Sequence, residues 1–234
     1  MKDIKKILFI VQARTNSERV PKKMIRPIGN TSLFEIFLNK IKQTNIPLNQ
    51  FYASVFDLEL KDLCLKHNIN IFHRSIESRN TDNSLRTMYE WYDKFPQFKY
   101  AVLFNPCLLF LKPKTIDGFV QKYINSHYDG LFGVMEKRQY YWNQNKEMIT
   151  PWPKDCTIMN TKIVEPTYEA AHALYAGKLK LIGKNQWMGN FKTNNPALYL
   201  MQEQECLDID HEWQFQLYSS FYEKNYLGLG YPYG

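Results

Sequence analysis

Over the first 125 residues, short continuous apolar runs alternate with segments whose apolar residues recur every three or four positions. Continuous runs are typical of strands buried on both faces of a sheet, and the longer spacing is typical of amphipathic helices. We expect strands at 6–11, 51–56, 70–72 and 100–104, and helices at 31–41, 58–67, 85–95, 114–125 and, late in the chain, 212–221. This alternation predicts βαβ units, and hence an α/β fold with a mostly parallel, twisted sheet sandwiched by helices.

From about residue 130 to residue 200 the alternation loosens, and Trp142, Trp152 and Trp187 stand among Pro and Asn residues. We interpret this segment as strands and long loops that form an inserted flap or a dimerisation arm. No stretch has the composition of a linker, and no segment repeats along the chain. The sequence therefore predicts a single domain over residues 1–234, with 130–200 as a looser insertion.

Basic residues outnumber acidic ones, because 30 Lys and Arg against 23 Asp and Glu give a formal net charge of +7. The 44% of hydrophobic residues can fill a core, which excludes a disordered chain. The positive excess suits nucleic acid, anionic lipid or a small phosphorylated ligand. Because the chain has neither a long basic stripe nor an RNA-binding signature, we expect no nucleic-acid partner, and a nucleic-acid-binding module is a less favoured alternative.

The cysteines and the apolar runs bear on the cellular compartment. Cys64, Cys107, Cys156 and Cys206 are far apart and form no C-x-x-C pair, which argues for reduced thiols and against a zinc site or disulfide framework. The run from Ile7 to Val11 is too short for a secretory signal or a membrane span, and no later run is long enough. We therefore expect a soluble, cytoplasmic protein that does not enter a membrane.

A basic loop follows the first predicted strand. Arg14, Arg19, Lys22 and Lys23 lie within ten residues, and such a cluster can neutralise a triphosphate, with arginine donating forked hydrogen bonds. Ser17 and the loop N–H groups offer further donors. Ligands of doubly wound sheets bind at the carboxyl ends of strands, where this loop would lie. The alternative interpretation is a solvated basic loop, since the glycines of the common phosphate-binding motifs are absent.

A second candidate is the acidic pair Asp208 and Asp210 on either side of Ile209. In an extended segment the two carboxylates point to the same side, with Ile209 turned into the core. Mg²⁺ is commonly held by one or two carboxylates together with substrate phosphates. The alternative is that one aspartate caps the helix expected at 212–221.

The two segments together resemble a known family. ARTNSERVPKK at 13–23 is similar to the A-R-x-x-S-x-R-x-P-x-K signature of the acylneuraminate cytidylyltransferases, and ECLDID at 205–210 is similar to their E-x-x-D-I-D segment. The family activates sialic acids, 3-deoxy-manno-octulosonate and spore-coat polysaccharide sugars. The resemblance implies a nucleotide-diphosphosugar-transferase-like fold, often dimeric. It also implies that CMP is transferred from CTP to a sugar acid or related surface-glycan building block, with release of pyrophosphate.

The family's functional residues carry over to matching positions. The resemblance implies nucleotide binding by Ala13, Arg14, Ser17, Arg19, Lys23 and Arg74. It implies catalytic roles for Arg14, Lys23, Asp208 and Asp210, with Mg²⁺ held by the two aspartates, and acceptor binding by Asn105, Glu169 and His172. In such a transfer the acceptor oxygen attacks the α-phosphorus in line, while metal and cations stabilise charge on the pyrophosphate. For Arg74 a surface position is the alternative, and for His172 a place in the core.

The chain also departs from the family's pattern. Met24 replaces an asparagine that usually follows the signature lysine, and NPCLLFL at 105–111 replaces the Q-P-T-S-P-L-R of sialic-acid enzymes. The first departure falls at a position that contacts the nucleotide in the family, so it bears on recognition of the base. The second departure favours an acceptor other than a sialic acid. Three alternatives stay open: transfer of another nucleotide, nucleotide binding without turnover, and a glycosyltransferase, whose acid pair usually follows a strand in the middle of the chain.

Overall fold

The computed structural model describes residues 1–80, 84–189 and 195–228. The strands are β1 Ile7–Ala13, β2 Pro27–Ile28, β3 Thr31–Ser32, β4 Phe51–Val55, β5 Asn70–His73, β6 Tyr100–Phe104, β7 Leu131–Lys137, β8 Thr167–Lys178 and β9 Ala197–Leu200. The α-helices are α1 Leu33–Lys42, α2 Leu58–Lys66, α3 Ile76–Asn80, α4 Leu85–Met88, α5 Pro113–Asn125, α6 Leu179–Ile182 and α7 Glu212–Tyr226. The 3₁₀ turns are η1 Ile4–Lys6, η2 Leu48–Gln50, η3 Glu90–Asp93, η4 Thr161–Ile163 and η5 Glu203–Glu205. Within the described ranges, no helix combines the length and apolar character needed to cross a membrane.

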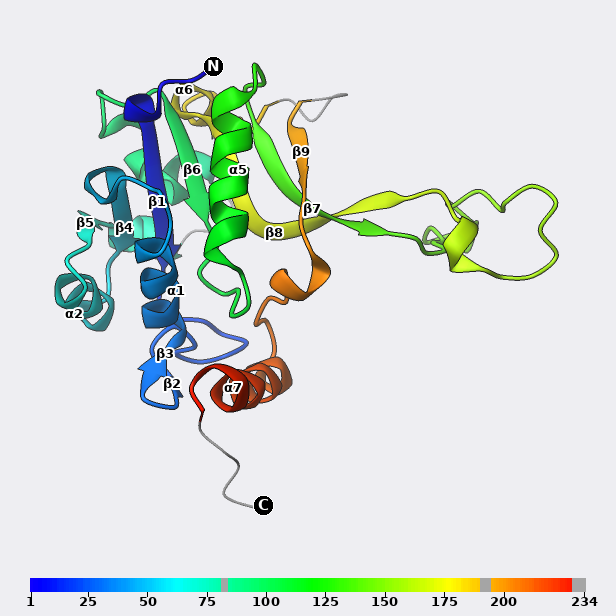
Figure 1. Ribbon diagram of the computed structural model, residues 1–234. Helices are drawn as coiled ribbons and strands as arrows, with labels where there is room; N and C mark the ends of the chain where they lie inside the picture. The colour runs from blue at the N-terminus through cyan, green and yellow to red at the C-terminus, as the bar shows by residue number, and fades with distance from the viewer. Residues whose placement is uncertain (81–83, 190–194, 229–234) are drawn as a thin grey trace.

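Seven strands form one sheet in the order β5-β4-β1-β6-β8-β7-β9, and β2 pairs with β3 separately. Strands β5, β4, β1 and β6 are parallel, β8 is antiparallel to both neighbours, and β9 is parallel to β7. The predicted α/β class with a mostly parallel sheet is confirmed. Because β4 lies on one side of β1 and β6 on the other, the connections diverge between β1 and β6 (Figure 1). Ligands of such sheets bind at this point, outside the carboxyl ends of the strands.

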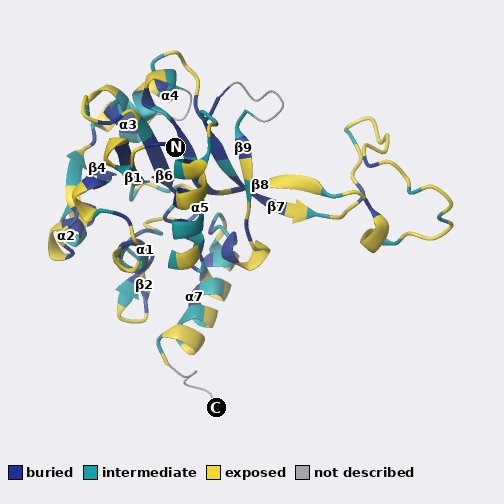
Figure 2. Ribbon diagram, turned by 45° about the horizontal axis from the view of Figure 1, so that its top comes forward, coloured by how far each residue is buried: buried dark blue, intermediate teal, exposed yellow. Residues whose placement is uncertain are grey.

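The core has one layer on each face of the sheet, because the side chains of β1 alternate between the faces. Phe9 and Val11 pack with residues of α1 and α5. Leu8 and Ile10 pack on the other face with Trp91 of η3 and with α6. All these side chains are fully buried, and Figure 2 shows the central strands as the most buried part of the molecule. Burial on both faces explains why β1 is a continuous apolar run.

The local signals in the sequence account for most element boundaries. The four predicted strands and the helices α1, α2 and α5 agree with the structure to within two residues at each end. Helix α1 begins after Ser32, whose hydroxyl accepts a hydrogen bond from the backbone N–H of Glu35 at 3.4 Å. Helix α7 begins at the predicted residue and continues to Tyr226, beyond the predicted end.

The segment 85–95, expected as one helix, is divided into α4 and the 3₁₀ turn η3, so that prediction was wrong. Between them Tyr89 has non-helical backbone angles, φ −108° and ψ 44°. The break allows Tyr89 and Trp91 both to pack on Trp187, with ring centroids 5.8 and 6.3 Å away. Packing against this distant residue overrides the local helical periodicity.

Residues 138–166 project from the sheet as an arm between β7 and β8 (Figure 1). Near the base of the arm, the β7–β8 register shifts between Phe132 and Val134, and His172 adopts a φ of 47°. The rest of the segment predicted as a looser insertion contributes β7, β8 and β9 to the main sheet. Large apolar side chains are exposed on the arm at Tyr141, Trp142, Met148, Ile149, Trp152, Ile158, Met159 and Ile163.

Candidate functional site

A cleft of about 480 Å³ lies at the carboxyl ends of β1 and β6, where the sheet connections diverge. This volume is typical of a small-molecule site. The loop after β1 and the loop after β6 both border it. The residues that the sequence predicted to bind a nucleotide all line this cleft, namely Ala13, Arg14, Ser17, Arg19, Lys23 and Arg74.

The basic loop is attached to the neighbouring strand through Asp57, which lies two residues after the end of β4. The carboxylate of Asp57 accepts hydrogen bonds from Thr15 N at 3.0 Å, Thr15 Oγ1 at 2.8 Å and Arg79 Nη2 at 2.7 Å. Burial alone would raise the pKa of Asp57, but the hydrogen bonds from Arg79 and Thr15 hold it below its usual value. Asp57 was missed in the sequence, where its position at the end of an apolar strand was the available signal.

Arg74 reaches the cleft from the end of β5. It is 7% exposed, and its guanidinium donates to Ser78 Oγ at 2.9 Å and Ser78 O at 2.6 Å, so it is not a surface arginine. Tyr89 and Met88 line the cleft beside it. Burial raises the pKa of Tyr89 to about 12, against the opposing effect of the Arg74 charge. The sequence analysis missed Tyr89 and Met88 because it assigned them to a regular helix.

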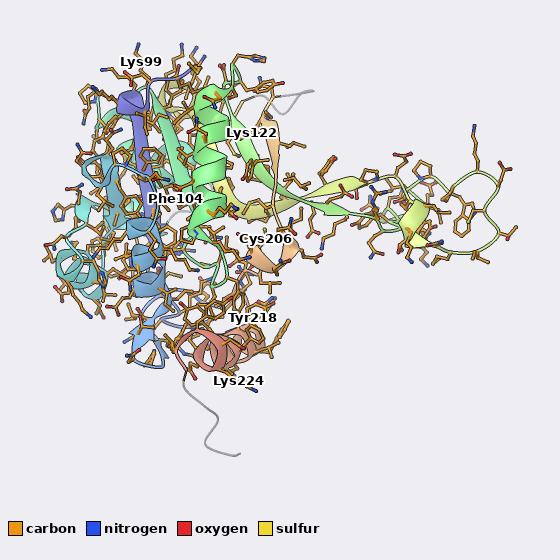
Figure 3. The ribbon with its side chains drawn as sticks, in the orientation of Figure 1. Lys99, Phe104, Lys122, Cys206, Tyr218 and Lys224 are labelled. Atoms are coloured by element: carbon orange, nitrogen blue, oxygen red, sulfur yellow. The ribbon has the colours of Figure 1, made fainter. Side chains whose placement is uncertain are left out.

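The acid pair precedes α7, which lies beyond the carboxyl ends of the parallel strands (Figure 1). As predicted, Ile209 is fully buried. Burial raises the pKa of the Cys107 thiol, and the charges of Asp208 and Asp210 both add to this rise. Cys107 is a residue of the cleft lining. The N-cap residue of α7 is His211, so the alternative of a capping aspartate is wrong. Figure 3 shows Cys206, just before the pair, between the sheet and this helix.

Asp208 has a buried carboxylate oxygen whose hydrogen-bonding capacity is not satisfied within the described part of the chain. Its Oδ2 accepts a hydrogen bond from Asn105 Nδ2 at 3.2 Å, whereas its Oδ1 is buried without a hydrogen-bond partner among the described residues. Burial raises the pKa of Asp208, the charge of Lys23 opposes this rise, and Asp210 adds to it. Leaving a buried carboxylate oxygen unpaired costs free energy, so a cation or a donor brought by a ligand would be stabilised there.

The basic loop and the acid pair, which come from opposite ends of the chain, are in direct contact. Lys23 Nζ donates a hydrogen bond to Ile209 O at 2.5 Å and lies 3.7 Å from Asp210 Oδ1. Arg19 Nη2 donates to the same oxygen of Asp210 at 2.8 Å. The two segments that the sequence analysis combined are therefore in contact, with the basic loop lining the cleft and the acid pair lying behind it, outside the cleft lining.

The donor set is compatible with a magnesium ion. Among the described residues, no group of three or more His, Cys, Asp and Glu side chains could hold a metal ion. An ion bound here would take carboxylate oxygens from Asp208 and Asp210 and its other ligands from phosphates and water, which is the coordination Mg²⁺ commonly has in phosphate sites. The unpartnered Oδ1 of Asp208 fits such a ligand.

The three residues expected to bind an acceptor occupy different surroundings. Asn105 lines the cleft and also donates to His172 O at 2.7 Å. His172 is exposed on β8, with its Nδ1 3.4 Å from the hydroxyl of Tyr175, a phenol that the sequence analysis missed. Glu169 is exposed nearer the arm, 3.6 Å from Lys137 Nζ. Only Asn105 of the three lines the described cleft.

A protein-family model for cytidylyltransferases matches residues 8–226, a range that includes both the basic loop and the acid pair. The chain belongs to the cytidylyltransferase family. The family expected from the two sequence motifs is thereby confirmed.

Relatives of this cytidylyltransferase-family chain come from sequence and from structure. The spore coat polysaccharide biosynthesis protein SpsF of Bacillus subtilis is 30% identical over 89 residues, which are 35% of this chain and 37% of that protein. The chain thus matches little more than a third of the length of that relative. A CMP:2-keto-3-deoxy-manno-octonic acid synthetase complexed with CTP has a TM-score of 0.65 at 8% identity, over 94% of this chain and 99% of the other. The 4-diphosphocytidyl-2C-methyl-D-erythritol synthase of Anaerococcus prevotii has a TM-score of 0.66 at 12% identity, over 94% and 100%. At these identities the structural likeness shows the fold alone.

Proposed function

We propose that the protein is a Mg²⁺-dependent cytidylyltransferase that transfers CMP from CTP to a sugar acid or related surface-glycan building block and releases pyrophosphate. The observation that carries the proposal is the contact between the basic loop and the acid pair, through Lys23 and Asp210, at the cleft of a cytidylyltransferase-family chain. The names of two relatives, a spore coat polysaccharide biosynthesis protein and a CMP-sugar-acid synthetase complexed with CTP, support the choice of reaction and substrate class.

In this mechanism Arg14, Arg19 and Lys23 bind the triphosphate oxygens, and Lys23 is already oriented by its hydrogen bond to Ile209 O. As the acceptor oxygen bonds to the α-phosphorus and the bond to the β-phosphate oxygen breaks, negative charge moves onto pyrophosphate, where these cations stabilise it. A bound Mg²⁺ supplies further positive charge to the phosphates. Asp208 and Asp210 would hold that ion.

On the acceptor side we propose that Asn105, Glu169 and His172 contact the building block. Asn105 supports this role because its amide lies at the cleft and bonds to the backbone of His172. Cys107 gives this lining less hydrogen-bonding capacity than the hydroxyl residue that a sialic-acid enzyme has at the corresponding position. We therefore propose an acceptor other than a sialic acid.

The first test is thermal unfolding with CTP, UTP, ATP and GTP, each with and without Mg²⁺. A ligand that binds the folded state raises its unfolding temperature, so we expect a shift for CTP that is larger with Mg²⁺. Pyrophosphate release with a panel of sugar acids then identifies the acceptor. A shift limited to another nucleotide would favour that nucleotide as substrate. No shift with any of the four would contradict the proposal.

We further propose that the protein is a cytoplasmic homodimer. The four cysteines are free thiols, as expected in a reducing compartment where CTP is made. The arm exposes Trp152, Ile158 and Met159, and an apolar surface on a thin projection is typical of an interface. We assign a second copy of the chain as the occupant of this surface.

The arm is tested by light scattering after gel filtration. We expect a dimer for the wild type and a monomer for Ile158→Asp combined with Met159→Asp, because a buried charge without a partner destabilises the interface. Leu65→Asp, at an exposed apolar residue of α2, is the control and should remain dimeric. A monomeric wild type, or a dimer in all three proteins, would exclude the arm as the dimer contact.

A further inference from the structure

Lys40, on the last turn of α1, contacts the loop that follows β6. We infer that Lys40 is a positioning residue for the proposed transfer: its ammonium group holds the 105–112 loop, and through that loop it fixes the carboxylate of Asp208 beside the cleft-lining residue Asn105. The inference rests on the proposed function and adds to it a residue outside the cleft lining and outside both sequence motifs.

The first step is the contact between Lys40 and the loop. Lys40 Nζ donates hydrogen bonds to two consecutive carbonyl groups, Leu108 O at 3.1 Å and Leu109 O at 2.5 Å. The side chains of Leu108 and Leu109 are buried in the core. An ammonium group that bonds both carbonyls fixes the position and the direction of the backbone between them.

The second step leads from the loop to the acid pair. Leu108 forms an antiparallel backbone bridge with Asp208. Three residues earlier in the same loop, Asn105 Nδ2 donates to Asp208 Oδ2 at 3.2 Å, and Asn105 is itself oriented by a hydrogen bond from Cys107 N to its Oδ1 at 2.9 Å. The loop therefore contacts Asp208 through both its backbone and a side chain. A displacement of the loop would move the carboxylate.

The far end of the loop is fixed by an acidic side chain. Glu205, 3% exposed in η5, accepts a hydrogen bond from Lys112 N at 3.1 Å, and Lys112 Nζ lies 3.6 Å from its other oxygen. Glu205 also attracts the ammonium group of Lys40. Opposite charges from α1 and η5 thus hold the loop in its middle and at its end.

The burial of Lys40 is costly, which argues for a specific role. Burial lowers the pKa of Lys40 to about 7, and the charge of Glu205 only partly opposes this shift. A side chain such as methionine has a similar length and would not carry that cost, and replacing a buried charge by an apolar group is often neutral for stability. We therefore attribute the lysine to the placement of the loop.

The test compares Lys40→Met with Lys42→Met. Lys42 lies on the same helix, is exposed, and contacts His67 Nδ1 at 3.2 Å, so its substitution makes the same side-chain replacement away from the loop. For Lys40→Met we expect kcat to fall by about tenfold while the KM for CTP changes by less than about threefold, since a small displacement far from the chemistry slows the reaction more than it weakens binding. The unfolding temperature without ligand should stay within a few degrees of the wild type.

A second measurement does not depend on turnover. The rise in unfolding temperature that Mg²⁺ adds to CTP should require several-fold more Mg²⁺ in Lys40→Met than in the wild type or in Lys42→Met. A structural role alone would lower the unfolding temperature of the free protein and leave this Mg²⁺ dependence unchanged.

The outcomes separate this inference from the proposed function. A wild type with neither activity nor a response to Mg²⁺ and CTP would contradict both the proposed function and the role of Lys40. An active wild type with equal kcat and Mg²⁺ dependence in Lys40→Met and Lys42→Met would overturn the role of Lys40 alone. If Lys40→Met does not fold, Lys40→Gln, whose shorter amide cannot reach both carbonyls, is expected to show the same kinetic loss. Failure of both variants to fold would also overturn the inference, because the lysine would then be needed for the fold itself.

Discussion

Asp208→Asn is expected to lower kcat by about a thousandfold while the fold stays intact. The substitution keeps the shape of the side chain and removes the charge that would hold Mg²⁺ against the phosphates. Metal stabilisation of a developing phosphate charge contributes several kcal/mol, and about 1.4 kcal/mol corresponds to a factor of ten in rate. Steady-state pyrophosphate release over a range of Mg²⁺ concentrations measures the loss. Asp62→Asn, at an exposed acid of α2, is the control.

The stability of the same variant should change in the opposite sense. Burial raises the pKa of Asp208, so the folded protein holds this proton more tightly than the unfolded chain does. Above the folded pKa the charge therefore destabilises the fold, and the effect is lost as the pH falls below the unfolded pKa of about 3.9. Without metal, Asp208→Asn should unfold at the same or a higher temperature at pH 7, and Mg²⁺ should no longer stabilise it. A near-normal rate, or a clear loss of stability in the metal-free protein, would contradict the metal assignment.

The central part of the fold could be predicted because its signals are local. Strand β1 is buried on both faces and has a continuous apolar sequence, and α1 begins after Ser32, a residue type that commonly caps helices. The break at Tyr89 could not be predicted, because it depends on packing against Trp187, almost one hundred residues away. Likewise, β8 lies between β6 and β7 and is irregular at His172, where φ is positive. This irregularity interrupts the alternation of apolar and polar residues by which a strand is recognised in a sequence.

The residues of the candidate site also differ in how far the sequence alone reveals them. The basic loop and the acid pair each carry several chemically distinctive residues in a short segment, so both were visible in the sequence. Asp57 and Lys40 are single charged residues whose importance arises from partners elsewhere in the chain, Thr15 and the carbonyl group of Leu109. Their sequence neighbourhoods, an acid after a strand and a lysine near a helix end, are too common to single them out.

Two cations of the basic loop bond to the segment that carries the acid pair. Arg19 is paired with Asp210, and Lys23 is bonded to Ile209 O. Binding of CTP with Mg²⁺ would exchange these partners: the phosphates would take the cations, and the metal ion would take the carboxylates. Of these cations, Lys23 is expected to carry the larger effect, because its side chain is 13% exposed whereas that of Arg19 is 62% exposed, and water screens an exposed charge.

Lys23→Met is accordingly expected to lower kcat/KM for CTP by about a hundredfold. Hydrogen bonds to charged groups contribute about 1.5–3 kcal/mol each, and the contact would strengthen as charge moves onto pyrophosphate. The variant also removes the charge that opposes the rise in the pKa of Asp208. That pKa should therefore rise further, so the variant should lose more stability at pH 7 than at pH values below the unfolded pKa of Asp208.

The measurements are CTP binding by calorimetry, kcat/KM from pyrophosphate release, and unfolding temperature against pH. Lys122→Met is the matched control, because Lys122 is exposed on α5 near the end of the helix away from α7 (Figure 3) and its loss changes the net charge equally. If the Lys23 variant bound CTP within about twofold of the Lys122 variant, overall charge rather than a specific contact would explain nucleotide binding. The basic loop would then be the solvated loop that its lack of glycines first suggested, and the triphosphate would have to bind elsewhere in the cleft.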